Sequence, residues 1–109
     1  MKIIIAGAGE VGSHLAKMLS NEANDITVID ERLERLEALA ATTDVVTVEG
    51  NPSAIQTLQD AGAATADLFI AVNPSESVNT TACMIAAKLG ARKTLARIDN
   101  YEYLLPKNK

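Results

Sequence analysis

The chain begins with an apolar run that leads directly into three closely spaced glycines, in the stretch MKIIIAGAGEVGSHLAKML. A G-x-G-x-x-G motif that leaves a strand and opens a helix is typical of dinucleotide-binding α/β proteins. Gly7 then permits the tight turn, Gly9 lets backbone approach a pyrophosphate, and Gly12 lets the helix pack against the strand. The alternative interpretation is that the three glycines only form a turn.

The rest of the chain continues this alternation of short apolar runs and helical patterns. Runs rich in Ile, Val and Thr predict strands at Lys2–Ala6, Asp25–Ile29, Val45–Glu49, Leu68–Val72 and Thr94–Ile98. Helices are predicted at Val11–Asn21, Glu31–Ala41, Pro52–Ala61 and about Ser75–Leu89. Nearly continuous apolarity in the strands indicates a parallel sheet that is buried on both faces. The sequence therefore predicts a Rossmann-like, doubly wound α/β fold with strand order 3-2-1-4-5.

Capping residues and apolar spacing refine the predicted helices. Asn51 is a plausible N-cap with Pro52 in the first helical position, and Gly62 and Gly90 are stop signals for the third and fourth helices. The positions predicted to face the core are Val11, Leu15, Met18 and Leu19; Leu33, Leu36, Leu39 and Ala40; Ile55 and Leu58; and Val78, Ala82, Ile85, Ala86 and Leu89.

The length of 109 residues predicts one domain covering 1–109. A complete fold of this type usually has a sixth strand, and the closing stretch NYEYLLPKNK is too short to supply a helix and a strand. We therefore expect a fragment of a longer protein, truncated before that strand. Only 3% of the residues are aromatic, so the core is expected to be aliphatic.

Charge and cysteine content exclude several classes of function. The net charge of −4, with no basic block, argues against binding to nucleic acid or to an anionic membrane. The single cysteine, Cys83, excludes an internal disulfide and a cysteine metal cluster, and no metal site is predicted. The apolar run before Gly7 is too short for a signal peptide or a membrane span, so the cytoplasm is the expected location.

Asp30 ends the second predicted strand, where an acid in dinucleotide-binding folds accepts hydrogen bonds from the ribose hydroxyls. Such a carboxylate repels a 2′-phosphate and so favours NAD over NADP. Asp30 is also suited to be the N-cap of the helix that follows, and both roles can coexist. Arg32 is able to reach a 2′-phosphate, but a solvated charge or a cover for the adenine are the commoner roles.

Two further turns lie at the same edge of the predicted sheet. Gly50 and Asn51 follow the third strand and are expected near the adenine. After the fourth strand, Asn73, Glu76 and Asn79 are placed to reach a nicotinamide ribose or a phosphate. The alternative is capping of the fourth helix by Ser75 or Asn73, with Glu76 complementing the helix dipole. Glu10, inside the glycine loop, is expected to point away from phosphates, or to contact a metal or a partner.

The chain offers little for catalysis. A hydride-transfer enzyme needs a substrate pocket and usually a proton donor. His14 is the only histidine and is expected on a helix surface, and Cys83 is expected in the core. A nucleotide held without a catalytic apparatus suggests sensing.

Two long stretches resemble one known family. MKIIIAGAGEVGSHLAKMLSNEANDITVIDERLERLEAL resembles the N-terminal nucleotide-binding domain, called KTN or RCK, of Trk/Ktr-type potassium-uptake regulatory subunits. VVTVEGNPSAIQTLQDAGAATADLFIAVNPSESVNTTACMIAAKLGARKTLARIDN matches the family's third-strand glycine turn and its L-x-x-A-G-x-x-x-A-D segment. It also matches the E-x-x-N of Glu76 and Asn79 and the T-x-A-R of Thr94–Arg97.

This resemblance implies a cytosolic, non-enzymatic domain that binds NAD(H) or ATP/ADP. Such domains form dimers and then rings that dock on a membrane potassium channel or transporter, and the bound nucleotide gates ion flow. Gly7, Gly9, Val11 and Gly12 are then expected at phosphates, and Asp30 at ribose. Gly50 and Asn51 flank the adenine, and Asn73, Glu76 and Arg97 lie near the distal phosphate or a neighbouring subunit. The full candidate cofactor-binding set is Gly7, Gly9, Glu10, Val11, Gly12, Asp30, Glu31, Arg32, Gly50, Asn51, Val72, Asn73, Glu76 and Arg97.

Departures from the family pattern leave alternatives open. Gly50-Asn51 stands where many members carry Gly-Asp, and the family's last helix and strand and its C-terminal ligand-binding domain are missing. Arg97 is equally consistent with a surface ion pair. The main alternative function is the cofactor-binding half of an NAD-dependent oxidoreductase, and a nucleotide-binding module of another channel or exchanger is a third.

Overall fold

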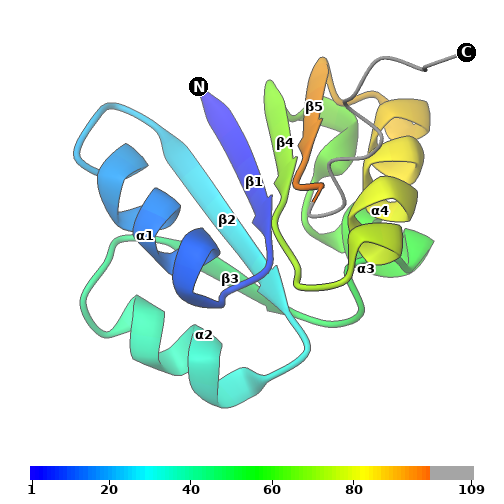
Figure 1. Cartoon of the computed structure of the whole chain (residues 1–109). Coiled ribbons are helices and arrows are strands. Elements are labelled where there is room, and N and C mark those ends of the chain that lie inside the picture. The colour runs from blue at the N-terminus through cyan, green and yellow to red at the C-terminus, as the bar shows by residue number, and fades with distance from the viewer. Residues whose placement is uncertain (99–109) are drawn as a thin grey trace, which may run out of the picture.

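The computed structural model describes residues 1–98, in which strands and helices alternate along the chain (Figure 1). The strands are β1 (Lys2–Ala6), β2 (Asp25–Asp30), β3 (Val46–Glu49), β4 (Leu68–Ala71) and β5 (Lys93–Ala96). The helices are α1 (Glu10–Leu19), α2 (Leu33–Ala40), α3 (Ile55–Asp60) and α4 (Glu76–Leu89), with a short 3-10 helix, η1 (Ala63–Thr65). The closing stretch NYEYLLPKNK, on which the expectation of a truncated domain depends, lies outside the described residues.

The strands form one parallel sheet with the predicted order β3-β2-β1-β4-β5. β1 is central, and Ile4 lies opposite Thr27 of β2 and Phe69 of β4. The chain moves outward from β1 to β3 and then returns to β4 on the other side of β1. This reversal brings the loops after β1 and β4 together at the carboxyl edge of the sheet, where open α/β sheets bind their ligands.

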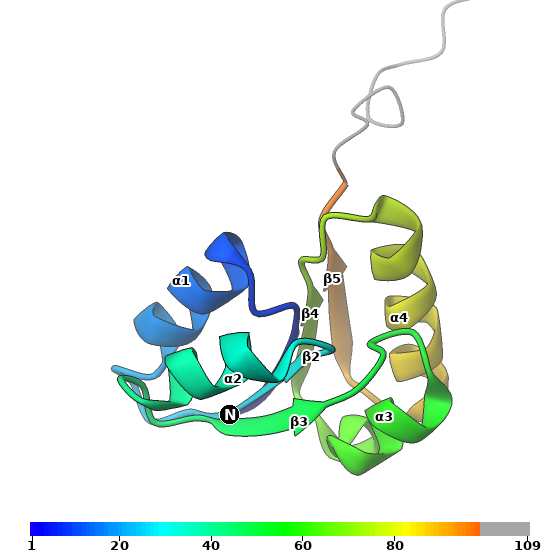
Figure 2. The same cartoon turned by 90° about the horizontal axis from the view of Figure 1, so that it is seen from below.

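α1 and α2 cover one face of the sheet, and α3 and α4 cover the other (Figure 1, Figure 2). Alternate residues of β1 pack on opposite faces of the sheet, because successive side chains of a strand point to opposite faces. Ile3 and Ile5 pack in a cluster with Ala16 of α1 and Leu36 of α2, while Ile4 packs on the other side. β1 is therefore enclosed on both faces, as its unbroken apolar sequence predicted.

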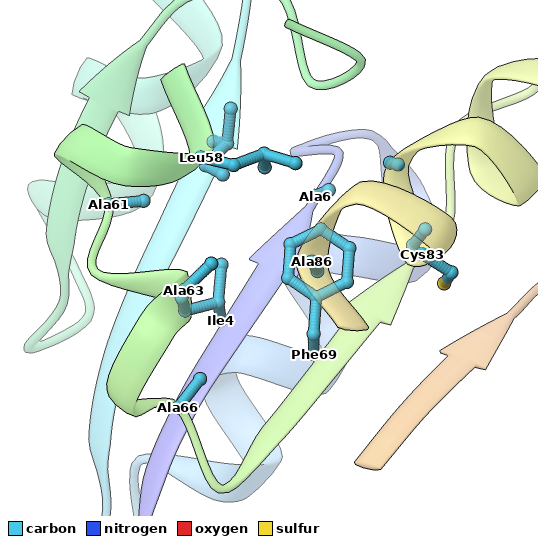
Figure 3. Packing of buried hydrophobic residues seen from close by; sticks show 12 residues of the cluster. Ile4, Ala6, Leu58, Ala61, Ala63, Ala66, Phe69, Cys83 and Ala86 are labelled. Carbon is cyan, nitrogen blue, oxygen red and sulfur yellow. The ribbon is translucent and has the colours of Figure 1, made fainter. Parts of the chain in front are cut away.

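The cluster under α3 and α4 is built around the one phenylalanine of the chain. Phe69 is fully buried with Ile4, Leu58 and alanines from α4 and η1, as Figure 3 shows. Small residues of α4, including Ala82 and Ala86, let that helix lie close to the sheet. Apart from Phe69 and Cys83, the buried apolar side chains among residues 1–98 are aliphatic, as the composition predicted.

The face that α1 turns to the sheet differs from the prediction. Gly12 and Ala16 are buried, with Leu15 and Leu19 packed beside them. Val11 and Met18, expected in the core, are 41% and 53% exposed. The small residues face inward because α1 starts in close contact with the glycine loop, and a larger side chain does not fit there.

The inward faces of α2 and α3 are also narrower than predicted. Leu36, Leu39 and Leu58 are buried, whereas Leu33 and Ile55 at the starts of the helices are largely exposed and Ala40 is exposed. α3 begins at Ile55 instead of Pro52, and Pro52 is buried in a turn before it. A short helix presents only about one turn to the sheet, so residues at its first position lie beyond the contact.

The two edge strands are less buried than their sequences predicted. Val46 of β3 is 64% exposed and Leu95 of β5 is 57% exposed. Each edge strand has a neighbour in the sheet on one side only, and the helices leave part of its faces uncovered.

A polar network closes the amino-terminal edge of the sheet. The Lys2 N–H donates to Asp67 Oδ2 at 2.7 Å, and Lys2 Nζ donates to the Gly62 carbonyl at 2.9 Å. Gly62 has a φ of 85°, the left-handed conformation that ends a helix, which confirms it as a stop signal. The ligand-binding candidates lie at the opposite edge, which is formed by the carboxyl ends of the strands.

Candidate functional site

The glycine loop connects β1 to α1 at the carboxyl edge of the sheet. Gly7 has a φ of 124°, which side chains rarely allow, and its N–H donates to the Ile29 carbonyl at 2.8 Å. A Cβ on Gly7 would lie 3.2 Å from the Val72 carbonyl group. The loop is thus pressed against both β2 and the segment after β4, which explains the need for glycine at this turn.

Gly12 and Gly9 serve different purposes in the same loop. A Cβ on Gly12 would collide with the Gly7 carbonyl oxygen, so position 12 is closed by the protein's own backbone. A Cβ on Gly9 would meet only the end of the Arg35 side chain, at 3.2 Å. Gly12 is therefore required by packing, while the space beside Gly9 is bounded by the end of the Arg35 side chain.

The first turn of α1 has free donors for an anion. Gly9 is its N-cap and provides no side-chain cap. The N–H groups of Glu10, Val11 and Gly12 lie in the first turn, where an α-helix supplies no acceptor of its own. The helix dipole adds positive potential there, although the exposed carboxylate of Glu10 lies close by.

Asp30, at the end of β2, is joined directly to this loop. It is 4% exposed, and its Oδ2 accepts a hydrogen bond from the Ala8 N–H at 2.8 Å. Its Oδ1 accepts from the Arg32 N–H at 2.8 Å and lies 3.4 Å from Arg32 Nε. Burial raises the pKa of Asp30, but these hydrogen bonds and the Arg32 charge outweigh it and hold the pKa below 3.8. Asp30 is thus a fixed carboxylate beside the glycine loop.

The same contacts correct one prediction for Asp30. The N-cap of α2 is Arg32, and Asp30 binds the Arg32 N–H ahead of the helix instead of capping it. Each carboxylate oxygen keeps a second lone pair, but the half-exposed side chain of Arg32 lies over Oδ1. Glu31 is exposed next to it.

The turn after β3 lies beside the end of β2. The Gly50 N–H donates to the Asp30 carbonyl at 3.0 Å, which holds Gly50 against the end of β2. Asn51 is exposed, and the prediction that it caps α3 is wrong. Its Oδ1 accepts from the Ser53 N–H and hydroxyl, each at 2.8 Å, in a local turn that the Asn-Pro-Ser sequence favours.

The segment after β4 completes the carboxyl edge. Val72 is 8% exposed, its N–H donates to the Ala6 carbonyl at 2.9 Å, and it packs against Gly12. Asn73 Nδ2 donates to the same carbonyl at 3.3 Å. Val72 therefore supports the glycine loop. Asn73 lies next to Val72, at the topological switch point, which is the place where the loops after β1 and β4 meet.

The N-cap Ser75 and the α4 residue Asn79 show how the start of that helix is held. Ser75 is its N-cap and accepts from the Val78 N–H at 3.4 Å, with Glu76 in the first turn. Asn79 is 1% exposed and its side chain bonds to backbone groups. This differs from the prediction that Asn79 reaches a ligand. Arg97 follows β5, where its N–H donates to the Ala71 carbonyl at 2.9 Å. Asn73, Glu76 and Arg97 thus stand on segments that meet at one side of the switch point.

Two residues near the loop were missed by the sequence analysis. Ala8 supplies the N–H that fixes Asp30, and Arg35 of α2 lies against Gly9. A pocket of about 360 Å³ between α1 and α2 adjoins the loop at Gly9 and extends to Lys17 and Leu39. A backbone donor leaves no signal in a sequence, but Arg35 lies one turn after Arg32, a spacing that places both on one side of α2.

The two side chains that the sequence analysis considered for catalysis, Cys83 and His14, lie on α4 and α1. Cys83 is 8% exposed, and burial raises the pKa of its thiol, which fits its expected place in the core. His14 is exposed on α1.

The sequence comparison decides the family. Residues 3–107 match the sequence model of the TrkA-N domain. The chain belongs to the TrkA-N family. It is 47% identical, over 100% of its length, to the Trk system potassium uptake protein TrkA of Haemophilus influenzae. It is 40% identical, over 95% of its length, to a TrkA homologue of Archaeoglobus fulgidus. The chain spans 24% and 23% of these two relatives, about a quarter of their length.

Solved structures share the fold of this TrkA-N domain. The Shewanella denitrificans Kef CTD in its AMP-bound form matches with a TM-score of 0.79 at 21% identity, over 95% of this chain and 65% of that one. The GsuK channel bound to NAD matches with a TM-score of 0.76 at 20% identity, over 95% of this chain and 19% of that one. At these identities the likeness shows the fold. Within residues 1–98 of this TrkA-N domain, no helix is both long and apolar enough to cross a membrane.

Proposed function

We propose that this TrkA-N domain is a nucleotide-sensing regulatory part of a potassium uptake system. In this proposal it binds NAD(H), or ATP/ADP, in the cytoplasm and controls a membrane potassium transporter or channel without catalysing a reaction. Residues 1–109 would act as one domain of a longer regulatory protein. The family assignment and the names of its relatives support the potassium role.

One observation carries the nucleotide part of the proposal. The carboxylate of Asp30 lies 2.8 Å from the Ala8 N–H, inside the glycine loop. An acid that grips a ribose diol and a loop that receives a phosphate therefore stand side by side at the switch point.

The remaining candidates fit the rest of such a ligand. With the phosphate at Gly9, Val11 and Gly12, the adenine would lie toward Gly50 and Asn51, next to the end of β2. The portion beyond the first phosphate would extend toward Asn73, Glu76 and Arg97. Arg32 would leave Asp30 and cover the adenine or ribose.

Control of a transporter is then a matter of linkage. Two nucleotides shift the protein only if they bind its conformations unequally. A shift from 10:1 to 1:10 needs about 2.7 kcal/mol of differential affinity. One or two charge-assisted hydrogen bonds to the distal part of the ligand have that magnitude. Assembly as dimers and rings would pass the change to the membrane partner.

Thermal-shift titration of the chain with NAD, NADH, NADPH, ATP, ADP and AMP tests the nucleotide role. A ligand at 100 times its dissociation constant stabilises by about 2.7 kcal/mol, which raises the unfolding midpoint by several degrees. NADPH is expected to raise it least, because its 2′-phosphate meets the Asp30 carboxylate. Asp30→Ala should abolish most of the shift, and Asp44→Ala, an exposed acid at the other edge of the sheet, should keep it.

A separate turnover assay distinguishes the proposal from an oxidoreductase. A sensing domain should show no turnover of NADH with carbonyl substrates. No shift with any adenine nucleotide would refute nucleotide sensing, and specific NADH turnover would establish an enzyme.

A further inference from the structure

Asn79 is the most deeply buried polar side chain near the site. It lies one turn into α4, is 1% exposed, and makes hydrogen bonds with each of its polar atoms. Its Oδ1 accepts from the Asn73 N–H at 2.7 Å, and its Nδ2 donates to the Asn73 carbonyl at 2.9 Å. Nδ2 also donates to the Arg97 carbonyl at 3.1 Å. One amide thus satisfies both backbone groups of one residue and a carbonyl of another.

These hydrogen bonds join two segments that are far apart in sequence. Asn73 belongs to the loop after β4, and Arg97 follows β5. The amide therefore ties the second loop of the switch point to the end of the edge strand. The sheet ladder reaches only as far as the hydrogen bond from Arg97 N–H to the Ala71 carbonyl at 2.9 Å. Beyond that point, the Asn79 side chain holds the two segments together.

The loop that Asn79 holds also touches the glycine loop. The Asn73 nitrogen is 3.3 Å from the position of a Cβ on Gly7, and Asn73 Nδ2 donates to the Ala6 carbonyl at 3.3 Å. A contiguous set of contacts therefore runs from Asn79 through Asn73 to Gly7. Asp30 bonds to the Ala8 N–H of the glycine loop, whereas the bonds of Asn79 go to Asn73 and Arg97.

We propose that Asn79 is a positioning residue that determines how tightly the site holds the part of a dinucleotide beyond its adenosine phosphate. It is too buried to touch a ligand, and it acts by placing Asn73 and Arg97. This inference rests on the proposed nucleotide site and deepens it, because it assigns selectivity between a mononucleotide and a dinucleotide to a residue outside the binding surface.

Only an amide fulfils this role, for a chemical reason. The position requires one acceptor and two donors in a space closed to water. A carboxylate keeps the acceptor but turns both donor contacts into repulsion between oxygens. Asn79→Asp therefore keeps the volume and removes the two bonds that hold the Asn73 and Arg97 carbonyls.

The test compares dissociation constants for NAD and AMP by calorimetry in the wild type and in Asn79→Asp. AMP needs only the glycine loop and Asp30, so its affinity should stay within about twofold. The affinity for NAD should fall about tenfold, the effect of one lost hydrogen bond to a polar ligand group. Thr80→Ala is the matched control, since Thr80 is exposed on the next position and bonds only within α4.

A pH series adds a readout that general destabilisation would not give. The introduced carboxyl, once protonated, can donate one hydrogen bond and replace part of the lost amide. The ratio of NAD to AMP affinity, relative to wild type at the same pH, should recover as the pH falls from about 8 to 5. Asp30 stays ionised over this range because its pKa lies below 3.8.

A measurement on the unaltered protein covers the case in which Asn79→Asp does not fold. The side-chain amide of Asn79 gives its own pair of resonances in a proton–nitrogen correlation spectrum. NAD should shift this pair while AMP leaves it in place.

The possible failures are distinguishable. An unchanged affinity ratio in folded Asn79→Asp, or no NAD-specific shift of the Asn79 amide, would overturn the positioning role alone. Wild type that binds neither nucleotide would overturn the proposed function, and the positioning role with it.

Discussion

At the residue scale, Asp30 links stability and binding in one carboxylate. It satisfies two backbone N–H groups, from Ala8 in the glycine loop and from Arg32 before α2. Both bonds strengthen with the negative charge, which explains why the pKa of Asp30 is lowered despite its burial. The folded protein therefore keeps the carboxylate charged and pointed at the loop.

The stability that Asp30 contributes should depend on pH. A folded-state pKa below 3.8 means that this stability is present above about pH 4 and is lost as the pH falls through the folded value. Asp30→Asn, which does not titrate, should be less stable than wild type by about 1–3 kcal/mol near pH 7. The difference should shrink toward pH 3 in urea unfolding. A difference that stays constant or grows in acid would contradict this account.

The glycines of the loop should separate packing from binding. Gly12→Ala places a methyl group against the Gly7 carbonyl and should destabilise the fold by about 3 kcal/mol or more. Gly9→Ala meets only the mobile end of Arg35, so the free energy of unfolding should change by about 1 kcal/mol or less. Its affinity for AMP should nevertheless fall about tenfold or more, because the methyl group occupies the approach of the phosphate. Urea unfolding and calorimetry of both variants check this, and equal AMP affinity in Gly9→Ala would refute a phosphate at Gly9.

At the element scale, α4 is a helix of the site in which specific residues mark both ends. Ser75 caps its first turn, and Gly90, with a φ of 131°, ends it. Between them Asn79, Ala82 and Ala86 lie against the sheet. The first turns of the helix therefore hold the loop after β4 through Asn79, and Ala82 and Ala86 further along pack in the core.

Loss of the α4 cap should have a local and measurable cost. Ser75→Ala removes the acceptor for the Val78 N–H and should destabilise the protein by about 0.5–1 kcal/mol, at the lower end for a bond of 3.4 Å. Thr81→Ala, at an exposed position further along α4, leaves this bond intact and should have a smaller effect. Amide hydrogen exchange in the first turn of α4 should accelerate in Ser75→Ala only. Equal acceleration in both variants would argue against a cap.

Capping residues show what the sequence could and could not predict about elements. Ser75 and Asn51 each precede a helical pattern, and both were plausible caps. Only Ser75 caps a helix, because the backbone after Asn51 bends back through Pro52 and Ser53 before α3 starts. Such a turn depends on where the helix packs, which local sequence does not specify.

At the scale of the whole molecule, the alternation of strands and helices predicted the order of the sheet. Nearly continuous apolarity in the strands indicated a parallel sheet, and the reversal after the third strand followed from general topology. The site's glycines and Asp30 were found because their spacing is tied to the start of α1 and the end of β2. The Ala8 bond and the enclosure of Asn79 arise between distant segments and carry no local pattern.

Burial at this scale should separate two leucines with the same chemistry. Leu58 is fully buried between α3 and the sheet, and Leu95 on the edge strand is 57% exposed. Leu58→Ala should cost about 2–5 kcal/mol, and Leu95→Ala less than about 1 kcal/mol. Urea unfolding of the two variants measures the contrast. Similar costs would mean that the uncovered face of β5 is buried in solution.

The central claim is that an adenosine phosphate binds where the glycine loop meets Asp30. Titration of the isotopically labelled chain with AMP, followed by proton–nitrogen correlation spectra, tests it residue by residue. We predict that the backbone amides of Ala8, Gly9, Gly12 and Arg32 shift, while those of Lys2, Asp67 and Lys93 at the opposite edge do not. Shifts centred on the opposite edge, or none at millimolar AMP, would contradict it.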